Sequence, residues 1–279
     1  MSIIERSLQK MATSNAEAAA NNRRTPRAQT APQPNAPATP AVPATEFRKI
    51  QLDPPTLESN RILAGIADPV AMSAYKMLRT RVLQRTSQNG WRNLGVTGTL
   101  AGEGKSLTAI NLALALARDV NTHVFLVDMD LQRPSVATQL GMNFDKGLSD
   151  YLVGNASREE IIYSPGIDRF AVIPNANRGN HHSELLGSPR MDELMASLTQ
   201  EAPARIVIYD LPPLLVSDDV LSIAPRLDAM LLVATQGITE RKVLESAREI
   251  LAEVNLLGVV LNRSTEHEKR SYGYEYHAT

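Results

Sequence analysis

The strongest chemical signal in the sequence is a glycine-rich turn that runs from Gly98 to Ser106. It reads GTLAGEGKS, follows the apolar segment from Leu94 to Val96, and leads into an apolar stretch that begins at Leu107. Glycines let the backbone curl so that its N–H groups point at phosphate oxygens, and a following helix adds the positive end of its dipole. A strand, a loop of this kind and a helix in this order predict a phosphate-binding site.

Lys105 and Ser106 supply the side chains that such a loop needs. We expect Lys105 to reach the β- and γ-phosphates of a nucleotide and the Ser106 hydroxyl to bind Mg²⁺. The strict pattern G-x-x-x-x-G-K-[ST] starts with glycine, whereas this chain has Thr99 there and Gly98 one residue earlier. The residues expected to contact the nucleotide are Ala101, Gly102, Glu103, Gly104, Lys105, Ser106 and Leu107.

Two other apolar segments end in aspartates. Residues 124–127 lead into Asp128 and Asp130, and residues 206–209 lead into Asp210, which two prolines follow after one leucine. The carboxyl ends of parallel strands meet at one edge of a sheet, where open α/β folds bind ligands, so we expect these carboxylates to face the phosphate loop. Asp210 has the form of a Walker B aspartate, which assists the Mg²⁺ shell.

These motifs lie within a regular alternation of strands and helices. A helix should begin after Asp68, which suits an N-cap, with Pro69 at its first position. The alternation predicts an α/β fold, a P-loop NTPase with a mostly parallel sheet flanked by helices. We expect strands near 93–98, 123–128, 169–173, 205–210, 228–235 and 257–262, and helices at 105–118, 184–199, 217–225 and 239–254.

The N-terminal part of the chain has a different composition. Residues 13–50 are rich in Ala, Asn, Thr, Gln and Pro, and such a segment buries too little apolar area to offset its ordering entropy. We therefore expect a disordered linker there. Before it, Ile4, Leu8 and Met11 share one helical face within residues 1–12, which favours either a docking helix that folds on a partner or a frayed terminus.

Composition excludes several classes of protein. The 279 residues include 29 Lys and Arg against 30 Asp and Glu, a net charge of −1 that does not favour a nucleic-acid binder. The chain has no Cys, which excludes disulfides, thiolate-held iron–sulfur clusters and a cysteine nucleophile. No apolar run approaches the roughly 20 residues of a membrane helix, and no secretory signal is recognisable. We expect a cytoplasmic protein.

Together the segments GEGKS, VFLVDMDLQRP and IVIYDLPP resemble the Walker A, A′ and Walker B motifs of bacterial tyrosine kinases (BY-kinases) of capsule and exopolysaccharide biosynthesis. The resemblance covers roughly residues 60–276, and the start MSIIERSLQKM is similar to that of cytoplasmic, single-domain members. It implies a P-loop ATPase or kinase domain at 60–265 and a tyrosine-containing tail at 266–279. It also implies ATP and Mg²⁺ as cofactors, and the activity of a non-specific protein-tyrosine kinase that phosphorylates itself and regulates polysaccharide polymerisation and export.

The resemblance further implies a role for each residue with suitable chemistry. Lys105 would bind phosphates, and Ser106 with Asp210 would complete the Mg²⁺ shell. Asp128 would orient or deprotonate the incoming tyrosine hydroxyl and would also belong to the metal site with Ser106 and Asp210. Asp130 would support the geometry of the metal and the loop.

Two further sets of residues follow from the same resemblance. Asn262 and Arg263 would lie near the adenine base. Tyr272, Tyr274 and Tyr276, in the last eight residues of the chain, would accept the phosphate, and the added charges would repel one another.

The partners implied are a membrane polysaccharide co-polymerase or chain-length determinant as activator, a cognate phosphatase, and a homo-oligomeric ring. They would place the protein at the inner membrane as a peripheral component. Ring-forming members carry E-x-x-R-x-x-R before Walker A, whereas this chain has Ser73, Lys76 and Arg79 at those positions. Only the last arginine is kept, so the oligomeric state stays open. The Walker B motif also departs from the family pattern, because Leu211 stands where the family has Ser or Thr.

Two other functions remain as alternatives. A partitioning-type ATPase shares the fold and acts as a nucleotide switch, but its signature lysine would align with Leu100. A regulatory nucleotide-binding module would let ATP modulate a membrane co-polymerase without transferring phosphate to tyrosine.

Overall fold

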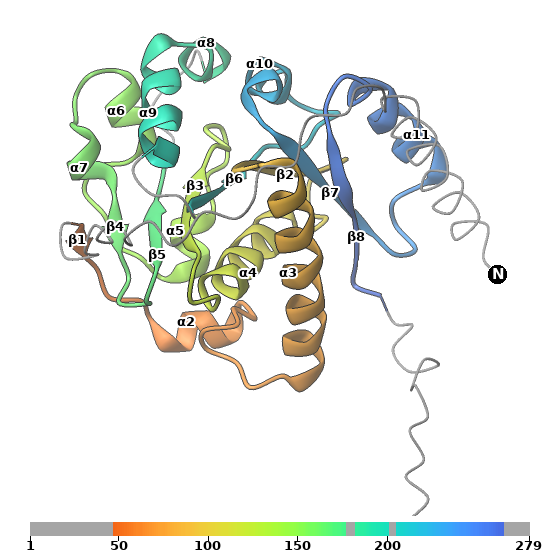
Figure 1. Ribbon diagram of the computed structural model, residues 1–279, viewed down its shortest axis with the longest axis horizontal. Helices are drawn as coiled ribbons and strands as arrows, with labels where there is room; N and C mark the ends of the chain where they lie inside the picture. Colours follow the sequence, from red (N-terminus) through yellow and green to blue (C-terminus); the bar gives the residue numbers. More distant parts are fainter. Residues whose placement is uncertain (1–46, 177–181, 201–204, 265–279) are drawn as a thin grey trace, which may run out of the picture. The chain divides into compact units, whose positions relative to one another are not determined.

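The computed structural model describes residues 47–176, 182–200 and 205–264 (Figure 1). Within these ranges the chain forms one sheet in the order β1-β4-β5-β3-β6-β2-β7-β8, and every neighbouring pair is parallel except β4 with β5. The strands are β1 (Arg48–Lys49), β2 (Asn93–Gly98), β3 (His123–Asp128), β4 (Tyr163–Ser164), β5 (Phe170–Ile173), β6 (Arg205–Asp210), β7 (Ala229–Thr235) and β8 (Leu256–Asn262). The mostly parallel sheet predicted from the sequence is confirmed.

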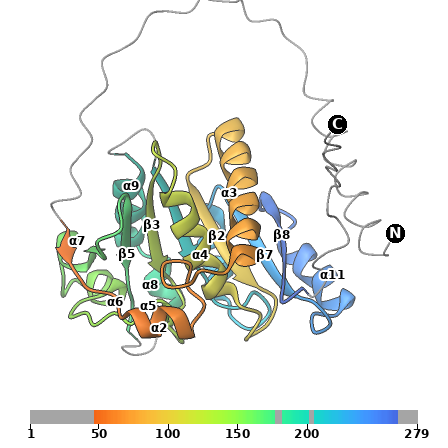
Figure 2. The same ribbon diagram turned by 90° about the horizontal axis from the view of Figure 1, so that it is seen from below.

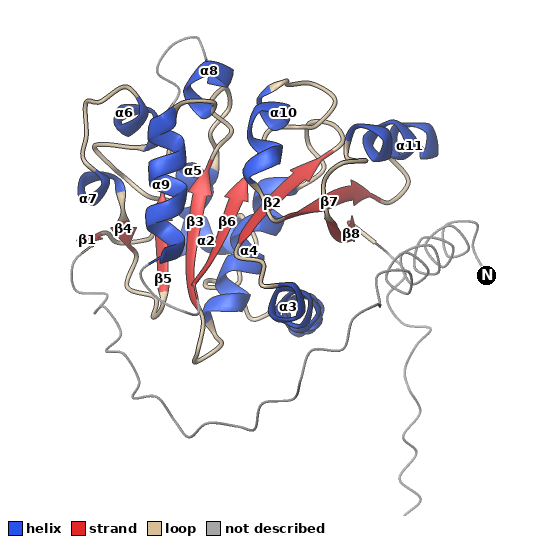
Figure 3. Ribbon diagram, turned by 45° about the horizontal axis from the view of Figure 1, so that its top comes forward, coloured by secondary structure: helices blue, strands red, loops and turns tan. Residues whose placement is uncertain are grey.

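Helices flank both faces of this sheet (Figure 2 and Figure 3). They are α2 (Pro54–Ser59), α3 (Pro69–Asn89), α4 (Lys105–Ala117), α5 (Val136–Leu140), α6 (Leu148–Leu152), α7 (Arg158–Ile161), α8 (His182–Leu186), α9 (Pro189–Gln200), α10 (Asp219–Ile223) and α11 (Arg241–Ile250). None of the helices in the described ranges is long and apolar enough to span a bilayer.

Alternate side chains of the central strands enter two separate cores. Phe125 and Val127 of β3 pack in the core that includes buried residues of α9 and α10, whereas Val124 and Leu126 pack in the core built around α4. A strand that is buried on both faces reads as a continuous apolar run, which is the pattern that made these strands recognisable in the sequence.

Helix ends follow the local signals in most places. Asp68 caps α3 as predicted, because its Oδ1 accepts the N–H groups of Val70 and Ala71 at 2.9 and 3.1 Å. The single helix expected over 184–199 is wrong, since α8 ends at Leu186 and α9 begins at Pro189. Proline has no N–H and clashes with the preceding turn, so it starts a new helix there.

The described structure begins at Phe47, inside residues 13–50, whose composition indicates a linker. Arg48 and Lys49 form β1, which pairs with β4, and the Phe47 ring meets Phe125 at 5.8 Å between centroids. The docking helix predicted over residues 1–12, the linker before residue 47, and the tail from residue 265 lie outside the described residues.

Candidate functional site

The loop between β2 and α4 has the backbone that a phosphate site requires. Gly102 and Gly104 have φ of +83° and +86°, a region that other residues rarely adopt. A Cβ on Gly104 would lie 2.1 Å from Asn262 Nδ2, so only glycine fits. Gly104 is also the N-cap of α4 and brings no side chain to the first N–H groups of the helix, which suits an anion at this terminus.

Two residues at the end of β8 donate hydrogen bonds to the backbone of this loop. The Asn262 Nδ2 group donates to the Glu103 carbonyl at 2.9 Å, and the Arg263 Nη2 group donates to the Gly102 carbonyl at 3.1 Å. The family resemblance implied a place near the adenine base for both residues. In the structure their polar groups contact the backbone of the phosphate loop.

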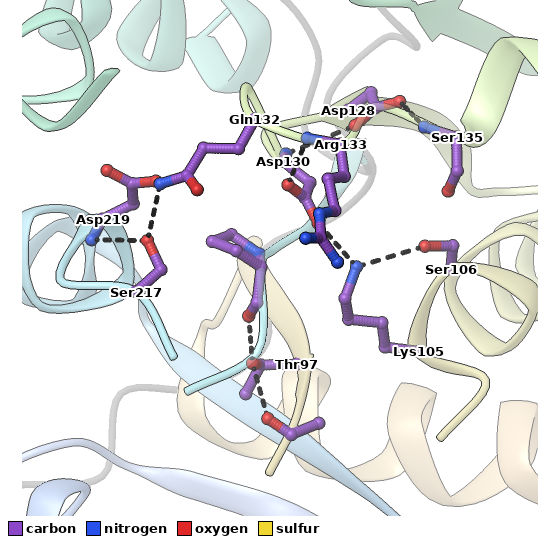
Figure 4. Close-up of polar contacts among 12 residues, drawn as sticks. Thr97, Lys105, Ser106, Asp128, Asp130, Gln132, Arg133, Ser135, Ser217 and Asp219 are labelled. Atoms are coloured by element: carbon purple, nitrogen blue, oxygen red, sulfur yellow. Dashed lines mark hydrogen bonds and ion pairs between the residues drawn. The ribbon is translucent and has the colours of Figure 1, made fainter. Parts of the chain in front are cut away.

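Lys105 points at the acidic end of β3 (Figure 4). Its Nζ lies 2.9 Å from Asp130 Oδ2 and 3.5 Å from Ser106 Oγ, and the side chains of Lys105 and Asp130 are only 11% and 5% exposed. Burial alone would lower the pKa of Lys105, but the charges of Asp210 and Asp130 outweigh it and raise that pKa. Lys105 therefore remains an ammonium ion at the mouth of the loop.

Asp128 is fully buried at the end of β3. Its Oδ2 accepts the N–H groups of Ser135 and Val136 at 2.9 Å each, and its Oδ1 accepts the Asp130 N–H at 3.3 Å. Burial first, and the neighbouring charge of Asp210 second, raise the pKa of Asp128 well above its usual range. A carboxylate with a raised pKa is suited to accept a proton near neutral pH.

Asp210 lies beside Asp128, because β3 and β6 pair in the register Asp128↔Asp210. Both carboxylate oxygens of Asp210 are buried, and within the described structure neither has a hydrogen-bond partner. Burial raises the pKa of Asp210 to about 6, and the charge of Lys105 opposes that rise. The Ser106 hydroxyl lies near enough to favour the charged form but not to complete a hydrogen bond, and such a buried carboxylate suits a further partner such as a hydrated cation.

The residues present fit Mg²⁺ only together with a phosphate ligand. Among the described residues, no three His, Asp or Glu side chains gather to hold a metal. Mg²⁺ usually keeps several waters and takes one or two protein oxygens along with substrate phosphates. The Ser106 hydroxyl and the orphaned Asp210 carboxylate are the groups that fit this mode.

The structure brings in residues that the sequence did not single out. The Thr97 hydroxyl donates to the Pro212 carbonyl at 2.7 Å and fixes the segment that follows β6. The Gln132 amide donates to Asp219 Oδ2 at 3.2 Å and connects the segment after β3 to α10. These pairs are far apart in the chain, so no local pattern indicates them.

The orphaned carboxylate leads to a prediction about stability without nucleotide or metal. The folded-state pKa of Asp210, about 6, lies above the ordinary 3.8, so ionisation of Asp210 destabilises the fold as pH rises through that interval. Asp210→Asn removes this cost, about 3 kcal/mol. In EDTA at pH 7.5 the variant should melt roughly 8 °C above the wild type, and the two should converge near pH 4. A difference in Tm that does not change with pH would contradict this origin.

Comparison with known proteins agrees with the geometry. Residues 94–276 match the family model of the CobQ/CobB/MinD/ParA nucleotide binding domain. The tyrosine-protein kinase YwqD of Bacillus subtilis strain 168 is 29% identical over 218 residues, which cover 77% of this chain and 91% of the relative. The putative tyrosine-protein kinase EpsB of Ralstonia solanacearum is 33% identical over 215 residues, which cover 75% of this chain but 28% of EpsB. The solved kinase domain of the Escherichia coli tyrosine kinase ETK superposes with a TM-score of 0.63 at 28% identity, covering 73% of this chain and 80% of that domain.

Proposed function

The chain belongs to the CobQ/CobB/MinD/ParA family of nucleotide-binding P-loop domains, and on that premise we propose that it is an ATP-dependent protein-tyrosine kinase. The relatives named above are tyrosine-protein kinases. The observation that carries the proposal is the meeting of Lys105 with Asp130 at 2.9 Å beside two fully buried aspartates, Asp128 and Asp210. A phosphate loop with a lysine and a buried proton acceptor is suited to phosphoryl transfer to a hydroxyl group.

The proposed reaction is an in-line transfer from ATP. The tyrosine oxygen forms a bond to the γ-phosphorus while the bond from that phosphorus to the bridging oxygen of ADP breaks. The phenolic proton passes to Asp128, and Lys105 stabilises the charge on the transferring phosphoryl group. Mg²⁺, when bound with ATP, supplies further charge neutralisation, and Ser106 and Asp210 are the residues that would hold it.

The substrate of the proposed kinase is the tail of the chain itself, at Tyr272, Tyr274 and Tyr276. The strand order supports this choice, because β8 runs parallel to β7 and ends at Asn262, whose amide contacts the phosphate loop. The described chain therefore ends at the carboxyl edge of the sheet, where the phosphate loop also lies.

The biological setting is part of the same proposal. We place the kinase in the regulation of capsule or exopolysaccharide polymerisation and export, at the inner membrane through a polysaccharide co-polymerase that activates it. A cognate phosphatase would reverse the modification, and a ring is one of the assemblies open to it. We expect no nucleic-acid partner.

Mass spectrometry of the purified chain after incubation with Mg-ATP tests this function. We expect phosphate on the tail tyrosines, and we expect its loss when Tyr272, Tyr274 and Tyr276 are all changed to Phe. ATP hydrolysis by that triple variant should stay within about twofold of wild type, since the groups proposed to bind the phosphates all lie outside the tail. Nucleotide binding without any phosphotyrosine, even when the cytoplasmic segment of the membrane partner is added, would favour the alternative of a nucleotide switch.

A further inference from the structure

Glu103 lies at a position that the phosphate-loop pattern leaves unspecified, yet its carboxylate is buried and bonded on both oxygens. Glu103 is only 3% exposed. Its Oε1 accepts the hydroxyls of Thr99 at 2.6 Å and Thr239 at 2.5 Å, and its Oε2 accepts the Leu100 N–H at 2.9 Å. The Thr239 hydroxyl also accepts the N–H of Thr235 at 2.8 Å, which fixes its direction.

This set of bonds accounts for the departure of the loop from the strict glycine pattern. Thr99, which stands at the first glycine position, is fully buried and uses its hydroxyl to bond Glu103. Gly98 is needed one residue earlier, because a Cβ there would lie 2.7 Å from Glu103 Oε2. The carboxylate of Glu103 thus fills the inside of the turn.

Glu103 also lies between two glycines, at which the backbone of the loop has the greatest conformational freedom. Gly102 and Gly104 both have positive φ, and glycine loses more conformational freedom on ordering than any other residue. Without an anchor between them, this stretch would have to be ordered when a ligand binds. Thr239 lies in the segment between β7 and α11, so its bond ties the loop to a separate part of the sheet edge.

We propose that Glu103 is a positioning residue for the nucleotide phosphates, and that Thr239 holds it in place. The pair keeps the phosphate loop in its binding shape before a nucleotide arrives, so the ordering cost is met during folding rather than during binding. The inference rests on the proposed function only in that the loop binds a nucleotide. It adds Thr99 and Thr239 to the residues on which that binding depends, and it gives the Glu103 side chain an indirect role inside the loop.

Binding of Mg-ADP, measured by calorimetry, tests the proposal with a matched pair of variants. Thr239→Val keeps the shape and loses the hydroxyl, and we expect Mg-ADP to bind about tenfold more weakly. Thr239→Ser keeps the hydroxyl and should restore affinity to within about twofold of wild type. Thr80→Val serves as the control, since Thr80 is exposed on α3 and its hydroxyl bonds only the Lys76 carbonyl among the described contacts.

A double-mutant cycle with Glu103→Gln tests whether the two side chains act together. If they do, adding Thr239→Val should weaken Mg-ADP binding less in Glu103→Gln than in wild type, because a neutral amide oxygen accepts the Thr239 hydroxyl less strongly than the carboxylate does. In Thr239→Val the KM for ATP should rise while kcat stays unchanged. This is expected when the lost interaction stabilises the ground state and the transition state equally. Glu103→Gln also provides the measurement if Thr239→Val fails to fold.

Three results would overturn the proposal. They are wild-type affinity for Mg-ADP in folded Thr239→Val, equal weakening in Thr239→Ser and Thr239→Val, and full additivity in the cycle. None of these readouts requires phosphoryl transfer. A chain that binds Mg-ADP with the expected pattern but phosphorylates no tyrosine would contradict the kinase function and leave the role of Glu103 intact.

Discussion

Replacing Lys105 by Met should lower tyrosine phosphorylation by at least about a thousandfold. The Lys105 ammonium lies 2.9 Å from Asp130 and is held charged by Asp210 and Asp130, whose negative charges raise its pKa despite its burial. In the proposed reaction it is the cation that meets the transferring phosphoryl group. Methionine keeps the length of the side chain and removes only the charge and the donors.

The measurement is the phosphate content of the chain by mass spectrometry, together with the Kd for Mg-ATP. Lys146→Met is the matched control, because Lys146 is a half-buried lysine whose Nζ bonds the Asn155 backbone carbonyl. Lys105→Arg should also be nearly inactive. The guanidinium of arginine is planar and larger than the compact ammonium group of lysine, so it does not fit the same position. More than a tenth of wild-type phosphorylation in Lys105→Met would refute the role given to this residue.

The same substitution should alter stability in a pH-dependent way. The positive charge of Lys105 opposes the rise in the pKa of Asp210. Without it, the negative charge of this fully buried carboxylate is less well stabilised. The folded variant should therefore hold the proton on Asp210 to higher pH. Its Tm relative to wild type should fall further at pH 8 than at pH 5.

The sequence predicted the central strands closely because burial on both faces leaves a clear pattern. The strands expected at 93–98, 123–128 and 205–210 have those bounds in the structure, and each ends at a motif with its own chemistry. β1 and β4 were not predicted, since two-residue strands carry no periodicity and form only through pairing with distant segments. The split between α8 and α9 was overlooked although Pro189 marks it.

The candidate site shows the same division between local and distant information. Lys105, Asp128 and Asp210 could be singled out because their motifs are contiguous, and the register between β3 and β6 brings the two aspartates together. The bond between Glu103 and Thr239 joins residues 136 positions apart, and nothing near either one in the sequence indicates it.

The full burial of Asp128 is likewise a property of the fold and not of the motif. A D-x-D at a strand end reads equally well as a solvated turn. Here the N–H groups of Ser135 and Val136 turn back onto the carboxylate and enclose it. These N–H groups belong to the start of α5, whose position beside β3 is not indicated by residue types.

Asp128→Asn is the substitution that separates chemistry from binding at this site. The asparagine oxygen can still accept the N–H groups of Ser135 and Val136 that Asp128 Oδ2 accepts at 2.9 Å, so the loop should keep its form. What is lost is the proton acceptor. We expect kcat for tyrosine phosphorylation to fall about a hundredfold or more, while the Kd for Mg-ADP stays within about threefold of wild type.

The pH dependence of the rate gives this prediction its sharpest test. Burial and the charge of Asp210 raise the pKa of Asp128, so the acceptor is protonated and inactive at pH values where an ordinary aspartate is already ionised. Wild-type kcat should therefore climb with pH above the usual aspartate range, and the residual activity of Asp128→Asn should lack that rise. Asp145→Asn is the control, because the Asp145 side chain is 79% exposed and pairs with Arg48 at the surface. If Asp128→Asn kept both its rate and its pH profile, Asp128 would act only as the anchor for Ser135 and Val136, and the proton would have to leave by another group.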